Sequence, residues 1–106
     1  MSETSVTIPC GRFNLEGSLG LPDRLTGAVP GVVVCHPHPL YGGDMNNSVV
    51  IAMCGALLDR GIATLRFNFR GAGGSGGSFD GGIGERDDAR AALAFLAERE
   101  EVDPER

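Results

Sequence analysis

The sequence predicts an α/β fold in which an antiparallel hairpin precedes parallel strands that alternate with helices. Two patterns support this fold class. Near the start of the chain, Ser5–Pro9 and Arg12–Glu16 alternate polar and apolar side chains, as half-buried strands do. Beyond them, short apolar runs alternate with segments of helical periodicity, which is typical of a parallel sheet covered by helices.

The hairpin is expected from two alternating runs, Ser5–Pro9 and Arg12–Glu16, which a short turn at Cys10 and Gly11 connects. The second strand is expected to extend through Gly17–Leu21. A polar loop with turn residues follows it.

The next strand, Gly31–Cys35, is continuously apolar and rich in valine, and such a run suits a strand buried on both faces. A helix follows over Asn47–Arg60, with Asn46 or Asn47 as its cap and Gly61 as the residue that ends it. Its apolar stripe is Val50, Met53, Cys54, Leu57 and Leu58.

The last two expected elements are a strand over Ile62–Phe69 and a helix over Gly84–Glu100. The apolar face of this helix is Ala89, Ala92, Leu93 and Leu96. The carboxylates expected at the positive end of its dipole are Glu85, Asp87 and Asp88. Such a helix normally leads into a further strand, so the sequence is interpreted as cut.

The composition excludes several classes of function. A chain of 106 residues allows one domain or part of one, and its net charge is −5 with no lysine. The acidic balance makes a nucleic-acid partner unexpected, and the missing lysine excludes a P-loop. The polar N-terminus does not resemble a signal peptide, and no apolar run is long enough to span a membrane. A cytoplasmic location is therefore expected.

The three cysteines, Cys10, Cys35 and Cys54, have no paired spacing. A disulfide framework is not expected from them. Each lies in an apolar stretch, so all three are interpreted as small core residues.

Two glycine motifs overlap after the last expected strand. Gly73–Gly77 matches G-x-S-x-G, the pattern of a nucleophile elbow with Ser75 as nucleophile. An elbow needs a tight strand–Ser–helix turn, however, and both histidines precede Ser75, against the Ser, acid, His order of this architecture. Gly71–Gly76 matches the dinucleotide fingerprint G-x-G-x-x-G, but no helix starts within its glycines and no strand-end acid follows. Both motifs are interpreted as a glycine-rich loop.

A metal site at His36 and His38, with Asp44 or Cys35, is also considered. Zinc needs three or four converging ligands, whereas Cys35 and His36 point to opposite faces of a strand. No metal and no cofactor are expected.

The His36–Asp44 loop is more informative, because it leaves the carboxyl end of a buried parallel strand. Pro37 and Pro39 fix φ and have no N–H, so the backbone donors of the turn are His38 and then Leu40. A rigid loop with a solitary N–H suits half of an oxyanion hole. The alternative is a loop stiffened for packing alone.

Three segments, Val32–Asn47, Thr64–Gly71 and Ser75–Asp80, resemble the bacterial HPHP-type α/β-hydrolases. These small cytosolic proteins are related to the dienelactone hydrolase and serine-aminopeptidase groups. The third segment resembles the loop after the family's fourth strand, typically R-G-x-G-x-S-x-G. The resemblance covers nearly the whole chain.

This resemblance implies the N-terminal part of an α/β-hydrolase fold, with the three-layer sandwich incomplete. It implies that the His38 N–H lies in the oxyanion hole, with Leu40 as the second choice. The residues that support the loop would be His36, Pro37, Pro39, Gly42 and Gly43. The family's Ser, Asp and His lie further along. Residues 1–106 are therefore expected to be a partial domain that stops before the nucleophile, with no catalytic residue in this chain.

The function implied is that of a serine-type, esterase-like hydrolase of small acyl substrates, with this chain inactive on its own. The alternative is a stand-alone, non-catalytic interaction domain. Self-association through an exposed strand edge is the expected protein contact, and neither nucleic acid nor membrane is expected as a partner.

Overall fold

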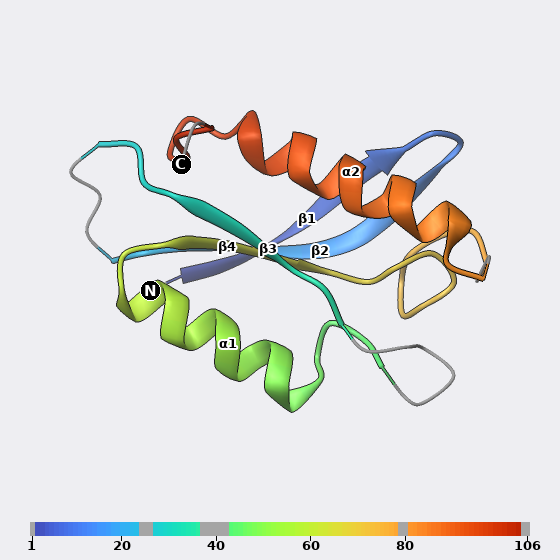
Figure 1. The fold of residues 1–106 in the computed structure, drawn as a ribbon, viewed down its shortest axis with the longest axis horizontal. Coiled ribbons are helices and arrows are strands. Elements are labelled where there is room, and N and C mark those ends of the chain that lie inside the picture. Colours follow the sequence, from blue (N-terminus) through green and yellow to red (C-terminus); the bar gives the residue numbers. More distant parts are fainter. Residues whose placement is uncertain (1, 24–26, 37–42, 79–80, 105–106) are drawn as a thin grey trace.

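The computed structural model describes residues 2–23, 27–36, 43–78 and 81–104. Its elements, in chain order, are β1 (Ser2–Cys10), β2 (Phe13–Leu21), β3 (Gly31–Val34), α1 (Ser48–Asp59), β4 (Ala63–Phe67) and α2 (Ile83–Ala97). The four strands form one sheet in the order β1-β2-β4-β3. Figure 1 shows α1 and α2 on opposite faces of this sheet. The predicted fold class is confirmed, as a partial α/β fold.

Strand pairing matches the sequence pattern. β1 and β2 pair antiparallel along their whole length, from Ser2 beside Leu21 to Cys10 beside Phe13. β4 pairs antiparallel with β2 and parallel with β3. The hairpin turn needs Gly11, whose φ of 59° lies in the left-handed region that glycine adopts without strain.

Helix α1 begins and ends where its capping residues predict. The Asn47 side chain accepts a hydrogen bond from Val49 N at 2.9 Å, which pairs one of the free N–H groups at the helix start. Gly61, at φ 79°, follows the C-terminal cap Arg60. Within the described residues, no helix combines the length and hydropathy of a membrane span.

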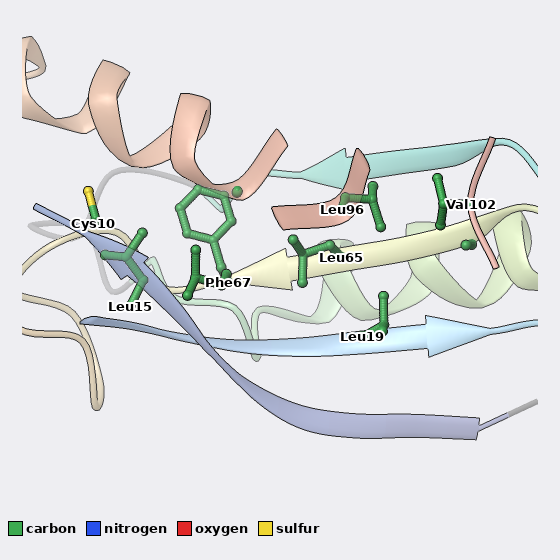
Figure 2. Close-up of a cluster of buried hydrophobic side chains, with 10 residues drawn as sticks. Cys10, Leu15, Leu19, Leu65, Phe67, Leu96 and Val102 are labelled. Atoms are coloured by element: carbon green, nitrogen blue, oxygen red, sulfur yellow. The ribbon is translucent and has the colours of Figure 1, made fainter. Parts of the chain in front are cut away.

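The larger core lies between the sheet and α2 (Figure 2). Its buried side chains are Ile8, Cys10, Leu15, Leu19, Ala63, Leu65, Phe67, Ala92, Leu96 and Val102. A smaller cluster of Val34, Val50 and Cys54 lies between the sheet and α1. Burying one large side chain of this kind contributes about 1.5–3 kcal/mol, so the α2 face supplies most of the hydrophobic stabilisation.

Two burial predictions for the strands and cysteines are wrong. β3 is not buried on both faces: Val32 is 37% exposed although Val34 on the same face is buried, and Val33 on the other face is half-buried, since β3 is the last strand of the described sheet. Cys35, expected in the core, is exposed beyond the end of β3. Cys10 and Cys54 are buried, as predicted.

In both helices, the apolar face that is buried against the sheet is also narrower than predicted. In α1, Met53 is 50% exposed, and the residues buried against the sheet are Val50, Cys54 and Leu58. In α2, Leu93 is 56% exposed and Ala89 is half-buried. The buried face of α2 has a strict four-residue spacing: Gly84, Asp88, Ala92 and Leu96. One side of each helix therefore contacts the sheet and the neighbouring apolar positions face outward.

The sequence places Asp88 among the carboxylates at the helix dipole, but the structure buries it completely. It accepts from Arg70 Nη2 at 2.8 Å, from Arg70 N at 2.9 Å and from the Cys10 thiol at 3.4 Å. The Arg70 guanidinium also stacks on Phe13, 5.0 Å from the ring centre. Hydrogen bonding to Asp88 raises the pKa of Arg70 above its ordinary value. This buried ion pair ties α2 to the residues that follow β4.

Replacing Asp88 with alanine should destabilise the chain strongly, because Arg70 would keep its charge and lose the buried carboxylate that binds it. Removal of one member of a buried pair costs about 3–5 kcal/mol. Urea denaturation of D88A measures this loss. The matched control is D87A: Asp87 is 66% exposed and lies 3.5 Å from Arg90. Equal stability of the two variants would contradict a structural role for the buried pair.

Candidate functional site

The carboxyl ends of β3 and β4 lie side by side, because the two strands are parallel. Open α/β sheets place their sites at this edge. The segment after β3 begins at Cys35 and His36, and the segment after β4 begins at Asn68.

His36 connects the two strand ends. Its side chain is only 7% exposed, and its Nε2 accepts a hydrogen bond from Phe69 N at 3.0 Å. The imidazole also meets the Phe69 ring edge-on, with centroids 4.9 Å apart. Because a backbone N–H can only donate, Nε2 must be the ring nitrogen without the proton. His36 therefore fixes the start of the loop against the residues after β4.

Met45 lies at the other end of the same loop, just before α1. Its N–H donates to Asn68 Oδ1 at 2.8 Å, and its carbonyl oxygen accepts from Arg66 Nη1 at 2.8 Å. Arg66 Nη1 also donates to Asn46 Oδ1 at 2.8 Å. Arg66 and Asn68 are two positions apart, so they project from the same face of the chain. Both polar groups of the Met45 backbone are thus paired with side chains at the end of β4.

Residues 36 and 45 flank the stretch in which the sequence places the oxyanion donor. His38, Leu40, Pro37, Pro39 and Gly42 lie outside the described residues. Of the predicted supporting residues, the structure describes His36 and Gly43, and both are buried.

Ser75 has a hydroxyl group that both donates and accepts a hydrogen bond. It donates to Asn68 O at 2.6 Å and accepts from Glu16 N at 2.8 Å. The segment after β4 runs through turns until α2 begins at Ile83, so Ser75 does not stand at a strand–helix elbow. The geometry agrees with interpreting Ser75 as a loop residue. The same turns separate the Gly71–Gly76 fingerprint from the start of α2.

Glu16 completes this polar cluster. Its Oε1 accepts from Asn68 Nδ2 at 2.6 Å and from Gly74 N at 2.7 Å. Sequence reasoning missed Glu16, Arg66 and Asn68. A signal was available, since Arg66 and Asn68 alternate with apolar residues in a run that otherwise has the composition of a central strand.

Among the residues that the structure describes, the remaining titratable groups do not form a further site. Within the described part of the chain, no three His, Cys, Asp or Glu side chains converge to hold a metal ion. Burial raises the pKa of the Cys10 thiol, and the hydrogen bond to Asp88 raises it further. Burial also raises the pKa of the Cys54 thiol. Both thiols are therefore less reactive than a free cysteine.

Replacing Ser75 with alanine should lower the free energy of unfolding by about 1–2 kcal/mol, because Glu16 N loses its acceptor and Asn68 O its donor. Thermal or urea unfolding measures the change. S78A is the matched control, since Ser78 is exposed in the same loop. An S75A variant as stable as S78A would contradict a bracing role for this hydroxyl.

The Glu3–Arg66 ion pair predicts a pH effect. Glu3 Oε2 lies 2.9 Å from Arg66 Nε, and this hydrogen bond lowers the pKa of Glu3 below its ordinary value of 4.5. A lowered folded pKa stabilises the chain above pH 4.5, and the stabilisation is lost as pH falls through the folded pKa.

In E3Q, the loss of stability at pH 7 should be no more than about 1 kcal/mol, since the pair is partly exposed. The difference from the unsubstituted chain should shrink as pH falls below 4.5. Urea denaturation over this pH range, with exposed Glu100→Gln as control, measures it. A difference that grows toward acid pH would contradict the assignment.

Comparison with known proteins agrees with this architecture. No family model matches the sequence. A stretch of 67 residues, 63% of this chain, is 57% identical to the uncharacterized protein RP471 of Rickettsia prowazekii and covers 28% of that protein.

Two solved structures match more of the chain. An alpha-beta serine hydrolase homologue from Coxiella burnetii is 40% identical, with a TM-score of 0.86 over 97% of this chain and 49% of that one. XC6422 from Xanthomonas campestris, described as an a/b serine hydrolase without lid, is 37% identical, with a TM-score of 0.84 over 97% of this chain and 48% of that one. This chain thus spans about half the length of these relatives. The comparisons support the α/β-hydrolase superfamily, and the fold is that of the N-terminal portion of an α/β hydrolase.

Proposed function

We propose that this chain forms the oxyanion-loop half of a serine-type α/β hydrolase that acts on small acyl substrates. One observation carries the proposal most directly: the two ends of the 36–45 loop are fixed to the end of β4, through His36–Phe69 and Met45–Asn68. The similarity to serine hydrolase homologues supports the same conclusion.

The chemistry assigned to the loop is stabilisation of negative charge. When a serine attacks an acyl carbonyl, the carbonyl oxygen becomes an oxyanion, and preorganised backbone N–H groups stabilise it. The proposed donor is the N–H of His38, with Leu40 as second choice, because Pro37 and Pro39 have none. A loop fixed at both ends suits this task, since a displaced donor loses most of its effect.

The proposal assigns the nucleophile, the acid and the proton-shuttling histidine to a longer protein that would contain this chain. Both histidines of this sequence precede Ser75, so no histidine follows Ser75 to complete a Ser, acid, His set in the required order. Esterase activity, the relation to dienelactone hydrolases and serine aminopeptidases, and a cytoplasmic location belong to the same proposal.

The oxyanion assignment predicts that H38P lowers the kcat of the complete gene product by about 10²–10³ on p-nitrophenyl esters. Proline removes the N–H, whereas the matched control H38A keeps it and should retain most activity. The 106-residue chain alone should show no turnover. Equal effects of H38P and H38A, or turnover by the 106-residue chain that S75A abolishes, would contradict the assignment.

The alternative function, a non-catalytic interaction domain, has one observation in its favour. Among the described residues, β3 pairs only with β4, and its Val32 is 37% exposed. An isolated parallel bridge between Val29 and Val102 covers only the stretch before β3. An apolar strand edge without proline or charge is a surface for pairing with another chain.

This edge predicts that the purified 106-residue chain self-associates. Light scattering over a concentration series should show dimers or larger species. Amide exchange at the N–H groups of Gly31–Val34 that point away from β4 should be fast at low concentration and slow in the associated species. A monodisperse monomer with slow exchange through β3 would contradict this prediction and favour an independently stable domain.

A further inference from the structure

Asn68 lies where three segments distant in the sequence meet, and it is only 2% exposed. Its Oδ1 accepts from Met45 N at 2.8 Å, and its Nδ2 donates to Glu16 Oε1 at 2.6 Å. Its backbone N donates to Glu16 O at 2.8 Å, and its backbone O accepts from the Ser75 hydroxyl at 2.6 Å. One residue therefore joins β2, the segment before α1 and the glycine-rich loop.

The two partners of the side chain require an amide at this position. Met45 N can only donate, and the Glu16 carboxylate can only accept, so the side chain must offer one acceptor and one donor. Leucine would offer neither. Aspartate would keep the acceptor for Met45 but would place a second carboxylate where the amide nitrogen now lies 2.6 Å from Glu16 Oε1.

The glycine-rich loop closes tightly over this amide. Gly73 has a φ of 49°, and a Cβ there would collide with Asn68 Nδ2 and lie 2.8 Å from Glu16 Oε1. Gly74 N donates to the same Glu16 oxygen at 2.7 Å. The donor side of the Asn68 amide is thus fixed by Glu16 and by the loop, which leaves its oxygen directed at Met45.

We propose that Asn68 is a positioning residue for the oxyanion loop, a role that rests on the proposed hydrolase function. Arg66 donates to the carbonyl oxygen of Met45, and Asn68 accepts from its N–H. Together they fix the position of the Met45 backbone, just before α1. Loss of the Asn68 amide leaves the Met45 N–H without its acceptor, while Arg66 still donates to the Met45 carbonyl oxygen. The proposal is that the loop end at Met45 then shifts and that the kcat of the hydrolase falls.

The test compares N68L with T64V in the complete gene product. Thr64 is the matched control because it is fully buried on the same face of β4 and makes no hydrogen bond to Met45 among those the structure describes. In N68L, amide exchange at Met45 should accelerate about tenfold or more, while exchange at Ala92 in α2 stays unchanged. The kcat should fall by about 10²-fold, with KM within about twofold. T64V should change none of these.

N68D is the variant to measure if N68L does not fold. Repulsion between the introduced carboxylate and Glu16 should release Gly74 and accelerate its amide exchange, while Met45 keeps its acceptor and its protection. The kcat of N68D should therefore exceed that of N68L wherever both fold.

Several results would overturn the proposal. They are an unchanged Met45 exchange rate in N68L, equal acceleration at Met45 and Ala92, loss of Met45 protection in N68D, or a raised KM at constant kcat. If the unsubstituted gene product neither hydrolyses acyl esters nor reacts with a fluorophosphonate, the proposed function fails and the positioning role fails with it. Met45 exchange would still report separately whether Asn68 anchors the loop.

Discussion

Parallel strands that end together leave the polar backbone of their loops at one buried edge, where every N–H and C=O needs a partner. In this chain, that pairing depends on His36, Arg66 and above all Asn68. Asn68 satisfies Met45 N, and its own backbone is paired with Glu16 and Ser75. Because one residue serves three segments, the loop before α1 and the glycine-rich loop are positioned relative to the same point on the sheet.

The two faces of β4 have different roles: one stabilises the fold, and the other positions the candidate site. Ala63, Leu65 and Phe67 enter the apolar core beneath α2, whereas Arg66 and Asn68 bind the loop before α1. The buried Asp88–Arg70 pair connects the segment after β4 to α2. A polar cluster of this kind is stable because the apolar face opposite supplies the hydrophobic burial that holds the strand in place.

Elements with local signals could be predicted from the sequence, whereas long-range polar contacts could not. Period-two alternation predicts the hairpin, and Asn47 and Gly61 mark the ends of α1. Asp88 has the sequence context of an exposed first-turn acid, and only the folded chain brings Arg70 and Cys10 to it. Likewise, nothing local shows that Glu16 and Asn68, far apart in the sequence, share a hydrogen bond. The continuous apolar run of β3 predicts burial on both faces. The sequence alone does not show that β3 is the last strand of the described sheet, where it is less covered.

The most direct measurement is a crystal structure of the complete gene product inhibited by an alkyl phosphonate, whose tetrahedral oxygen mimics the oxyanion. If the end of β4 positions an oxyanion loop, this oxygen will lie about 2.7–3.1 Å from the backbone N of His38. The Met45–Asn68 and His36–Phe69 hydrogen bonds will remain in place. A phosphonate oxygen held by other donors, with the His38 N–H directed away from it, would contradict the account.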